Sequence, residues 1–410
     1  MRISTVTMFE QSVGSLNQQQ SDFLKVSQQI ASGRRVVNPS DDPQAASRAV
    51  GVDQAKAVTQ QYADSRVSAR NSLSQSESVL NSVNDALVRA KSLMVQASSD
   101  TLSDVDRESV ASELQGVYES LIGQANATDG NGRYLFGGYQ DSSAPFVKDV
   151  NGDIEYAGDS RVREQRIDAS RLMPVSDTGE AIFMRVPSSA GYVAEAGEGN
   201  TGTGTYEEVR ITDRQQMADD LQAGNSFKVT FDDPPNTYQV EELDADGNTV
   251  ATTSGNYPAD NPIAMGGMEL KLSGEPDKDD TFTVQSADQA NTNIFATLEK
   301  AIDVLGQPTD TDAKQAAQRN TLKSVMRELD NGLDNVLTVR ASMGARLNEL
   351  DVVDSVGGNR TLNYEQTLSD LVDLDYSEAI SEYSLRQVGM QAAQKTFANM
   401  QGMSLFKFLN

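Results

Sequence analysis

The chain has 410 residues and a formal net charge of −26, and only 6% of its residues are aromatic. It contains no cysteine and no histidine, which excludes cysteine nucleophiles, serine–histidine–aspartate triads and the usual zinc sites. The acidic balance disfavours nucleic acid and anionic membranes as partners, because phosphate groups are bound by clustered lysine and arginine. We therefore expect a protein that is not an enzyme and needs no cofactor and no metal.

The N-terminal segment predicts a weakly amphipathic helix that ends at Ser32–Gly33. Polar residues, Gln20 and Ser27, occupy core positions between its apolar ones, so the seam is too weak to hold a helix pair alone. The segment lacks the apolar core of a secretory signal peptide, and we expect no Sec export. No stretch of the chain approaches the roughly 20 apolar residues that span a bilayer.

A second, longer helix is expected after Pro39. Asp41 or Asp42 can accept a backbone N–H as the N-cap, and Pro43 fits the first helical turn, where its missing N–H costs nothing. Beyond this start, apolar residues recur every seven positions beside small ones, which indicates close packing against another helix. The heptad residues are Leu73, Leu80, Leu87 and Met94.

An antiparallel helix is expected from about Ser103, with Asp104 and Asp106 in its first turn. The run Tyr134–Tyr139 then reads as a short strand that enters a hairpin. Further strands are predicted in the middle of the chain, and the Gly-rich segment 190–204 is expected to be a flexible loop. The clearest strands are Phe227–Phe231, Thr237–Val240 and Thr281–Val284.

Helices return near Asn293, and a heptad run from Leu329 to Leu350 carries one charge, Arg340, which is expected to fix the register. The last helix should start at about Asp375. Its apolar stripe is again interrupted by polar residues, Gln387 and Gln394. The stripe consists of Ile380, Tyr383, Met390, Ala393, Phe397 and Met400.

Two resemblances to binding motifs in the middle zone are rejected. Asp149–Asp153 suggests a calcium loop, but Ile154 stands where that loop needs glycine. Gly202–Thr205 lacks the third glycine of a dinucleotide fingerprint. Carboxylate pairs of the glycosidase type are not excluded by composition, but the acidic residues lie in turn-rich loops, where a solvated surface is the better interpretation.

These patterns predict an α+β fold that is elongated, in which long antiparallel helices from both chain ends form a coiled-coil or bundle stem and a mainly-β domain is inserted between them. We expect three parts. Residues 1–42 with 365–410 form terminal helices that are disordered before assembly, residues 43–145 with 290–364 form a helical rod, and residues 146–289 form an outward β-domain.

Both ends of the chain resemble the flagellin superfamily. The matching segments are Met1–Thr5 and Ile30–Pro43 at the front, and Arg340–Asn348 and Leu368–Leu409 at the back. Within the superfamily, Asn38–Pro43 together with Asn131–Gly138 is similar to the subunits that join the hook to the filament. Filament flagellins usually have an Ala-rich stretch after the paired aspartates. The middle zone carries no such resemblance.

The resemblance implies a structural adaptor of the bacterial flagellum, secreted through the flagellar type III apparatus. Its implied partners are hook-associated protein 1, flagellin and copies of itself in a ring. The exposed apolar C-terminus predicts a further partner, a cytoplasmic export chaperone. Its candidate contacts are Met403, Leu405, Phe406, Phe408 and Leu409.

Burial of the terminal seams is expected to wait for neighbouring subunits; the alternative is an ordinary helix pair within one chain. The candidate assembly interface is Val13, Leu16, Phe23, Ile30, Ile380, Tyr383, Met390, Phe397 and Met400. Charges around the predicted helix start, Arg34, Arg35, Asp41 and Asp42, form either a latch between subunits or a cap with a solvated face; we favour the second. Alternative functions are a filament flagellin or a surface adhesin that acts through the β-domain.

Overall fold

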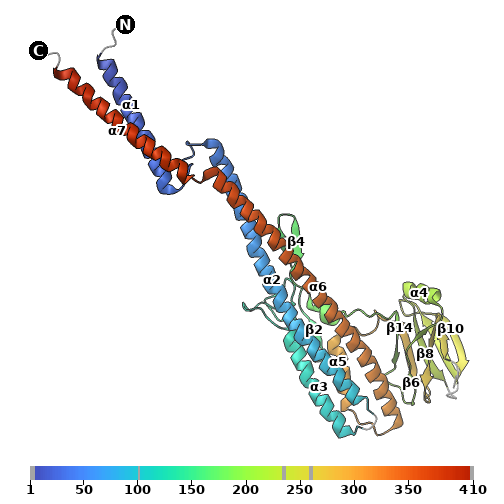
Figure 1. The fold of residues 1–410 in the computed structure, drawn as a ribbon. Coiled ribbons are helices and arrows are strands. Elements are labelled where there is room, and N and C mark those ends of the chain that lie inside the picture. The colour runs from blue at the N-terminus through green and yellow to red at the C-terminus, as the bar shows by residue number, and fades with distance from the viewer. Residues whose placement is uncertain (1–4, 100–101, 233–236, 258–261, 407–410) are drawn as a thin grey trace. The chain divides into compact units, whose positions relative to one another are not determined.

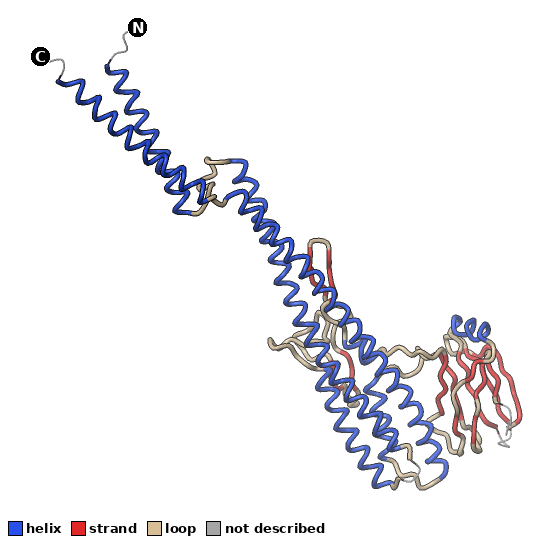
Figure 2. The backbone as a smooth tube through the Cα atoms, in the orientation of Figure 1, coloured by secondary structure: helices blue, strands red, loops and turns tan. Residues whose placement is uncertain are grey.

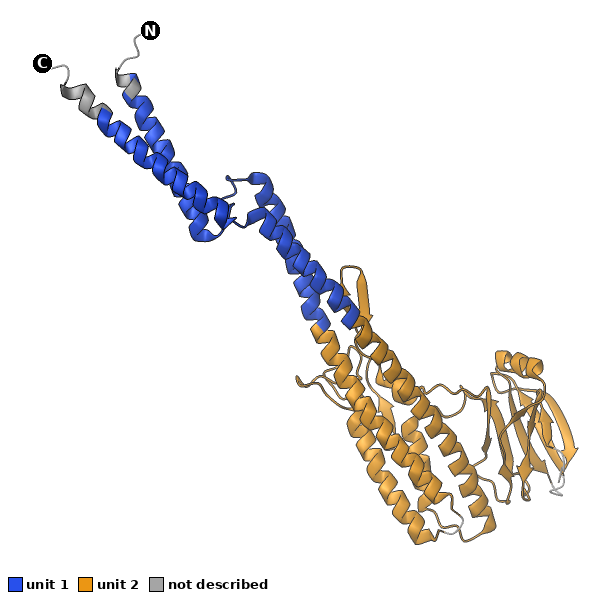
Figure 3. Ribbon diagram, viewed as in Figure 1, with its two compact units in different colours: residues 1–66, 351–410 blue, residues 67–350 orange. Residues whose placement is uncertain are grey.

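The computed structural model describes residues 5–99, 102–232, 237–257 and 262–406, without the side chains of residues 5, 6, 8 and 400–406. It divides into two compact units, Met1–Arg66 with Asp351–Asn410 and Val67–Leu350 (Figure 3). The boundaries fall inside two long helices, so each of those helices contributes to both units. The three-part division expected from the sequence is finer than this and stays a prediction.

The helices lie at both ends of the chain and the strands between them, so the α+β class is confirmed (Figure 1). The helices are α1 (Thr5–Ser32), α2 (Pro43–Ala97), α3 (Asp104–Ala125), α4 (Arg214–Ala223), α5 (Ile294–Gly306), α6 (Asp312–Val372) and α7 (Tyr376–Phe406), with a short π-helix η1 (Glu180–Met184). The strands are β1 (Phe146–Lys148), β2 (Ile154–Tyr156), β3 (Glu164–Asp168), β4 (Arg171–Pro174), β5 (Tyr192–Ala196), β6 (Thr205–Tyr206), β7 (Arg210–Ile211), β8 (Ser226–Asp232), β9 (Thr237–Leu243), β10 (Thr249–Asn256), β11 (Ile263–Met265), β12 (Met268–Leu270), β13 (Leu272–Ser273) and β14 (Thr281–Ser286).

Helix starts follow the capping residues of the sequence. Ser103 and Asp106 form a capping box at the start of α3, and the Asn293 side chain accepts the N–H groups of Phe295 and Ala296 at the start of α5. Each cap satisfies donors that have no partner inside the helix. The predicted starts of these two helices are therefore confirmed, with their physical cause.

In the second unit, α2, α3, α5 and α6 pack as a helical bundle. The predicted heptad residues of α2, from Leu73 to Met94, have no exposed surface. Glu77 pairs with Arg340 at 2.8 Å, and Lys91, further along α2, pairs with Asp330, which comes earlier in α6. The two helices are thus antiparallel, and Arg340 is half-buried in the seam beside its partner, consistent with a role in fixing the register.

The segment between α3 and the β-domain packs on this bundle through an aromatic cluster. Phe295 of α5 lies 5.3 Å from Phe146 and 5.7 Å from Phe183, measured between ring centroids, and all three rings are buried. The hairpins β1–β2 and β3–β4 belong to this segment. The first part of the expected outward domain, residues 146–186, therefore lies against helices.

The prediction of a strand at Tyr134–Tyr139 is wrong, because these residues form turns beside a single bridge between Thr128 and Tyr134. Gly138 explains the difference. It has a φ of +62°, and a Cβ there would lie 2.2 Å from the carbonyl oxygen of Asp159. Only glycine allows this turn and this close approach.

Residues 192–286 form a β-sandwich. A five-stranded sheet of order β10-β9-β8-β14-β5 faces the smaller sheets β11-β12-β7 and β13-β6, around buried residues such as Phe227, Phe231 and Phe282. The three predicted strands are confirmed as β8, β9 and β14. The expected loop at 190–204 is wrong in part, because Tyr192 and Ala194 enter this core and their segment pairs with β14 as β5.

One face of α6 holds the β-sandwich by polar contacts. The buried Tyr206 hydroxyl lies 2.7 Å from Ser324 Oγ, Lys323 Nζ donates to the Tyr206 carbonyl at 3.0 Å, and Arg327 donates to the Ala194 carbonyl at 3.1 Å. Hydrogen bonds demand a defined geometry, whereas apolar contacts tolerate sliding. These side chains therefore fix the position and orientation of the β-sandwich on α6.

We predict that Phe295→Ala destabilises the bundle by about 3–5 kcal/mol, because it leaves a cavity among three buried rings. Val105→Ala in α3, where the side chain is 71% exposed, is the matched control and should change stability by less than about 0.5 kcal/mol. Urea unfolding followed by far-ultraviolet circular dichroism measures both. Equal stability of the two variants would contradict the assigned core.

Candidate assembly interface

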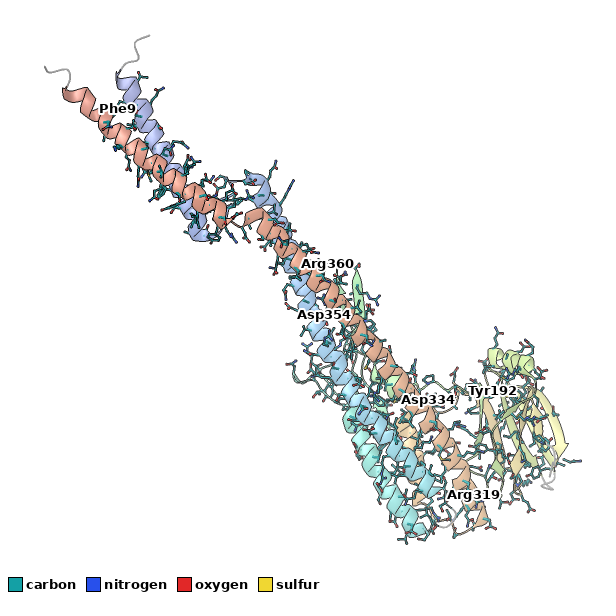
Figure 4. All side chains as sticks on the ribbon, in the orientation of Figure 1. Phe9, Tyr192, Arg319, Asp334, Asp354 and Arg360 are labelled. Atoms are coloured by element: carbon teal, nitrogen blue, oxygen red, sulfur yellow. The ribbon has the colours of Figure 1, made fainter. Side chains whose placement is uncertain are left out.

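The first unit contains an antiparallel pair formed by α1 and α7, the two ends of the chain (Figures 1 and 2). The ring of Phe9 (labelled in Figure 4) lies 5.4 Å from that of Phe397, measured between centroids. The rings of Phe23 and Tyr383 lie 4.9 Å apart. The two ends of the chain thus pair with each other within one chain. Further burial by neighbouring subunits stays a prediction.

Burial along this pair is incomplete. Among the described side chains, only Val26 and Ala379 are buried in α1 and α7. Seven of the predicted interface residues are half-buried on the seam: Val13, Leu16, Phe23, Ile30, Tyr383, Met390 and Phe397. Ile380 instead points to the outer face and is 55% exposed. The side chain of Met400 lies outside the described part of the chain.

The predicted chaperone contacts fall at the edge of what the structure describes. Met403, Leu405 and Phe406 belong to the last turns of α7, where only the backbone is described, and Phe408 and Leu409 lie outside the described residues. Their role stays a prediction.

Of the four polar residues expected in the seam, Ser27 is half-buried and the three glutamines are exposed. Gln20, Gln387 and Gln394 are exposed, whereas Asp22 and Arg386 face each other across the pair at 3.0 Å. The predicted polar character of the seam is present, in part with different residues.

A close contact between the two helices is also at a polar position. Gln19 is half-buried, and a Cβ on Gly389 would lie 3.2 Å from Gln19 Oε1. The small residue lets the helices come together, but the contact that it allows is with an amide group. The apolar residues of this seam are mostly half-buried, whereas the heptad residues of α2 have no exposed surface.

Apolar side chains also lie on the outer faces of the pair. Leu24, Ile380, Leu385 and Val388 are between 53% and 71% exposed. Single exposed apolar residues are common, but several on one helix pair are typical of a surface that contacts another protein. Leu385 and Val388 are not among the predicted interface residues, because the apolar periodicity identifies only the seam and these two residues lie away from it.

The predicted helix-start residues lie between α1 and α2. Pro43 opens α2, and Asp42 Oδ1 accepts the N–H of Ala45 at 3.0 Å, so Asp42 is the capping residue. Asp41 accepts the N–H of Asn38 at 2.9 Å and pairs with Lys25 at 3.1 Å. These hydrogen bonds, the backbone ones first, hold the pKa of each carboxyl below its usual value. Asp41 and Asp42 thus pair within the chain, with Lys25 and Arg35.

The described residues show no candidate metal centre. They contain no cluster of three or more side chains of the metal-binding types, and none of their helices has the length and apolarity of a membrane span. Glu328 is buried, which raises its pKa, but it accepts hydrogen bonds from Thr297 at 2.6 Å and Asn291 at 2.8 Å. Its place is structural, because it ties α6 to the start of α5.

The chain is similar to flagellar proteins. Residues 3–141 match the family of the bacterial flagellin N-terminal helical region. Flagellar hook-associated protein 3 of Escherichia coli (strain K12) is 35% identical over 408 residues, which cover 99% of each chain. FlgL of Xanthomonas campestris has a TM-score of 0.67 and 30% identity over 78% of this chain and 99% of its own. The flagellar junction protein FlgL from Legionella pneumophila has a TM-score of 0.63 and 25% identity over 80% of this chain and 100% of its own. Flagellins match at lower identity.

We predict that replacing the polar pair by leucine, Asp22→Leu with Arg386→Leu, stabilises the α1–α7 pair by about 1–3 kcal/mol, because half-buried charges are exchanged for apolar contacts. The control is Gln20→Leu with Gln387→Leu, which adds the same side chains at exposed positions and should leave the pair unchanged. Amide hydrogen exchange of α1 and α7 measures the effect. Equal protection in both double variants would show that the seam is wrongly assigned.

Proposed function

This chain belongs to the flagellar hook-associated protein 3 family, and on that basis we propose that it joins the hook to the filament of the bacterial flagellum, between hook-associated protein 1 and the first flagellin subunits. The observation that carries the proposal is the match to hook-associated protein 3 along 99% of both chains, with flagellins more distant. The relatives are structural flagellar proteins. A structural role is also consistent with the buried Glu328, whose carboxylate is used in hydrogen bonds between α6 and the start of α5.

Assembly would use the α1–α7 pair. The half-buried seam residues, such as Leu16 and Met390, have surface left to contact a neighbour, and the outer residues Leu24, Leu385 and Val388 have more. Packing against copies of the same chain, hook-associated protein 1 or flagellin would remove this apolar surface from water, and burial of that kind is the main favourable term in association. The partly covered interface is therefore completed by partners.

The low stability of the α1–α7 pair also suits export through the flagellar type III apparatus. A helix pair with Asp22, Arg386 and Gln19 in its seam gains little from folding before assembly, so the ends can pass a narrow channel unfolded. We place the mature protein outside the cell, at the hook–filament junction. A cytoplasmic chaperone would cover the apolar residues after Met400 until export.

Deletion of the gene should leave hooks without filaments, with flagellin shed into the medium as monomer, because the filament loses its attachment. Electron microscopy of the cells and analysis of the secreted protein measure both effects, and the restored gene is the control. Intact filaments on the deletion strain would contradict the proposal. If they came with lost surface attachment, the adhesin alternative would be favoured. Purified chain that elongates into long filaments would favour a flagellin.

For the chaperone, we predict that serine at Met403, Leu405, Phe406, Phe408 and Leu409 abolishes co-purification with the export chaperone from the cytoplasm, because the apolar contact surface is lost. Serine at Lys407 alone, inside the same segment, is the control and should keep binding. Retained binding of the five-residue variant would place the chaperone contact elsewhere.

A further inference from the structure

Both long helical stretches of the first unit are interrupted at the same place. Residues 33–42 form a loop between α1 and α2, and residues 373–375 form a loop between α6 and α7. The two loops lie together (Figure 2). Arg35 N donates to the Val372 carbonyl at 2.8 Å, and Leu374 N donates to the Gly33 carbonyl at 3.0 Å. We call this paired region, residues 33–36 with 371–374, the joint.

Arg35 makes contacts with three of the helices that meet here. Its Nη2 donates to the Leu371 carbonyl at 2.6 Å, and its Nη1 donates to Asp42 Oδ2 at 3.2 Å. Its own carbonyl accepts Gln29 Nε2 at 2.6 Å. The side chain therefore bridges the C-terminus of α6 and the capping residue of α2, while the backbone is held by α1.

The chemistry of these groups suits a guanidinium. The last carbonyls of a helix lack partners inside it and carry partial negative charge, and a planar fork can satisfy one of them and a carboxylate at the same time. Lysine has a single point charge on a flexible stem and cannot hold both acceptors in a fixed geometry. Two further residues shape the joint. Val36 is buried in it, and Gly33 has a φ of +69°, a backbone conformation that favours glycine.

We propose that Arg35 is a positioning residue that clamps the joint, keeping the ends of α1, α2 and α6 in one arrangement. A break in a helix is where bending under load concentrates, because the continuous backbone hydrogen bonds stop there. Arg35 replaces the missing bonds with contacts to all three helices. The clamp itself is independent of the proposed function, whereas its consequence in cells, firm attachment of the filament, rests on that function.

Hydrogen exchange of the purified full-length chain tests the clamp directly. In Arg35→Ala and Arg35→Lys, the amides of residue 35 and Leu374 should exchange at least tenfold faster than in the unmodified chain. Arg34→Ala is the matched control: it removes the same charge from the neighbouring residue and should leave both amides unchanged. An unchanged rate in Arg35→Ala, or the same acceleration in Arg34→Ala, would overturn the clamp. So would normal protection in Arg35→Lys, since charge alone would then suffice.

A second variant separates the ion pair from the helix cap. Asp42→Asn keeps a side chain that caps α2 well but removes the charge that Arg35 pairs with. It should accelerate exchange at Leu374 less than Arg35→Ala does, and leave exchange along α2 unchanged. Faster exchange along the whole of α2 would mean that the joint depends on the cap and would overturn the assignment to Arg35.

The cellular consequence is measured by filament loss under shear, in a deletion strain that carries each variant at equal secreted amounts. Arg35→Ala and Arg35→Lys should lose filaments several-fold faster than Arg34→Ala. Equal loss, with the exchange results as expected, would refute the mechanical role while the clamp stands. Filaments that persist in the deletion strain itself would refute the proposed function instead.

Discussion

The proposed assembly depends on one weak contact, the seam between the two ends of the chain. Asp22 and Arg386 pair across α1 and α7, and most apolar residues of the seam stay half-buried. A pair of charges in a partly solvated seam contributes little to stability, because attraction is offset by desolvation and by screening. The ends therefore remain available for partners, whereas the bundle is complete by itself.

Polar contacts recur wherever one part of the chain must be oriented on another within its unit. Arg35 spans helix ends in the first unit, and in the second unit Tyr206 and Arg327 hold the β-sandwich on α6. Apolar packing supplies the stability of each part, through the heptads of α2 and the rings around Phe295. Hydrogen bonds to particular carbonyls then fix the geometry, because such bonds require a defined distance and angle.

Much of this could be predicted from local rules. Caps such as Ser103 and Asn293 mark helix starts because a side-chain oxygen must meet free backbone donors, and heptads mark buried faces. Counting in sevens places Gln20, Gln387 and Gln394 in the seam, whereas Asp22 and Arg386 pair across it, because such a pair depends on how the two helices pack on each other. Tyr192 was read as part of a loop, since its strand pairs with β14, some ninety positions away in sequence. The contact of Arg35 with the end of α6 could not be predicted from the sequence, because the two residues come together only in the folded chain.

The central claim is that α1 and α7 are held weakly in the free chain and are completed by neighbours in the flagellum. Hydrogen exchange of the secreted, unassembled protein and of the same protein in isolated hook–filament structures tests it most directly. The account predicts fast exchange of Thr5–Ser32 and Tyr376–Phe406 in the free chain, strong protection of the α2 heptad region, and protection of all three in the assembly. Equally strong protection of α1 and α7 in the free chain would contradict it.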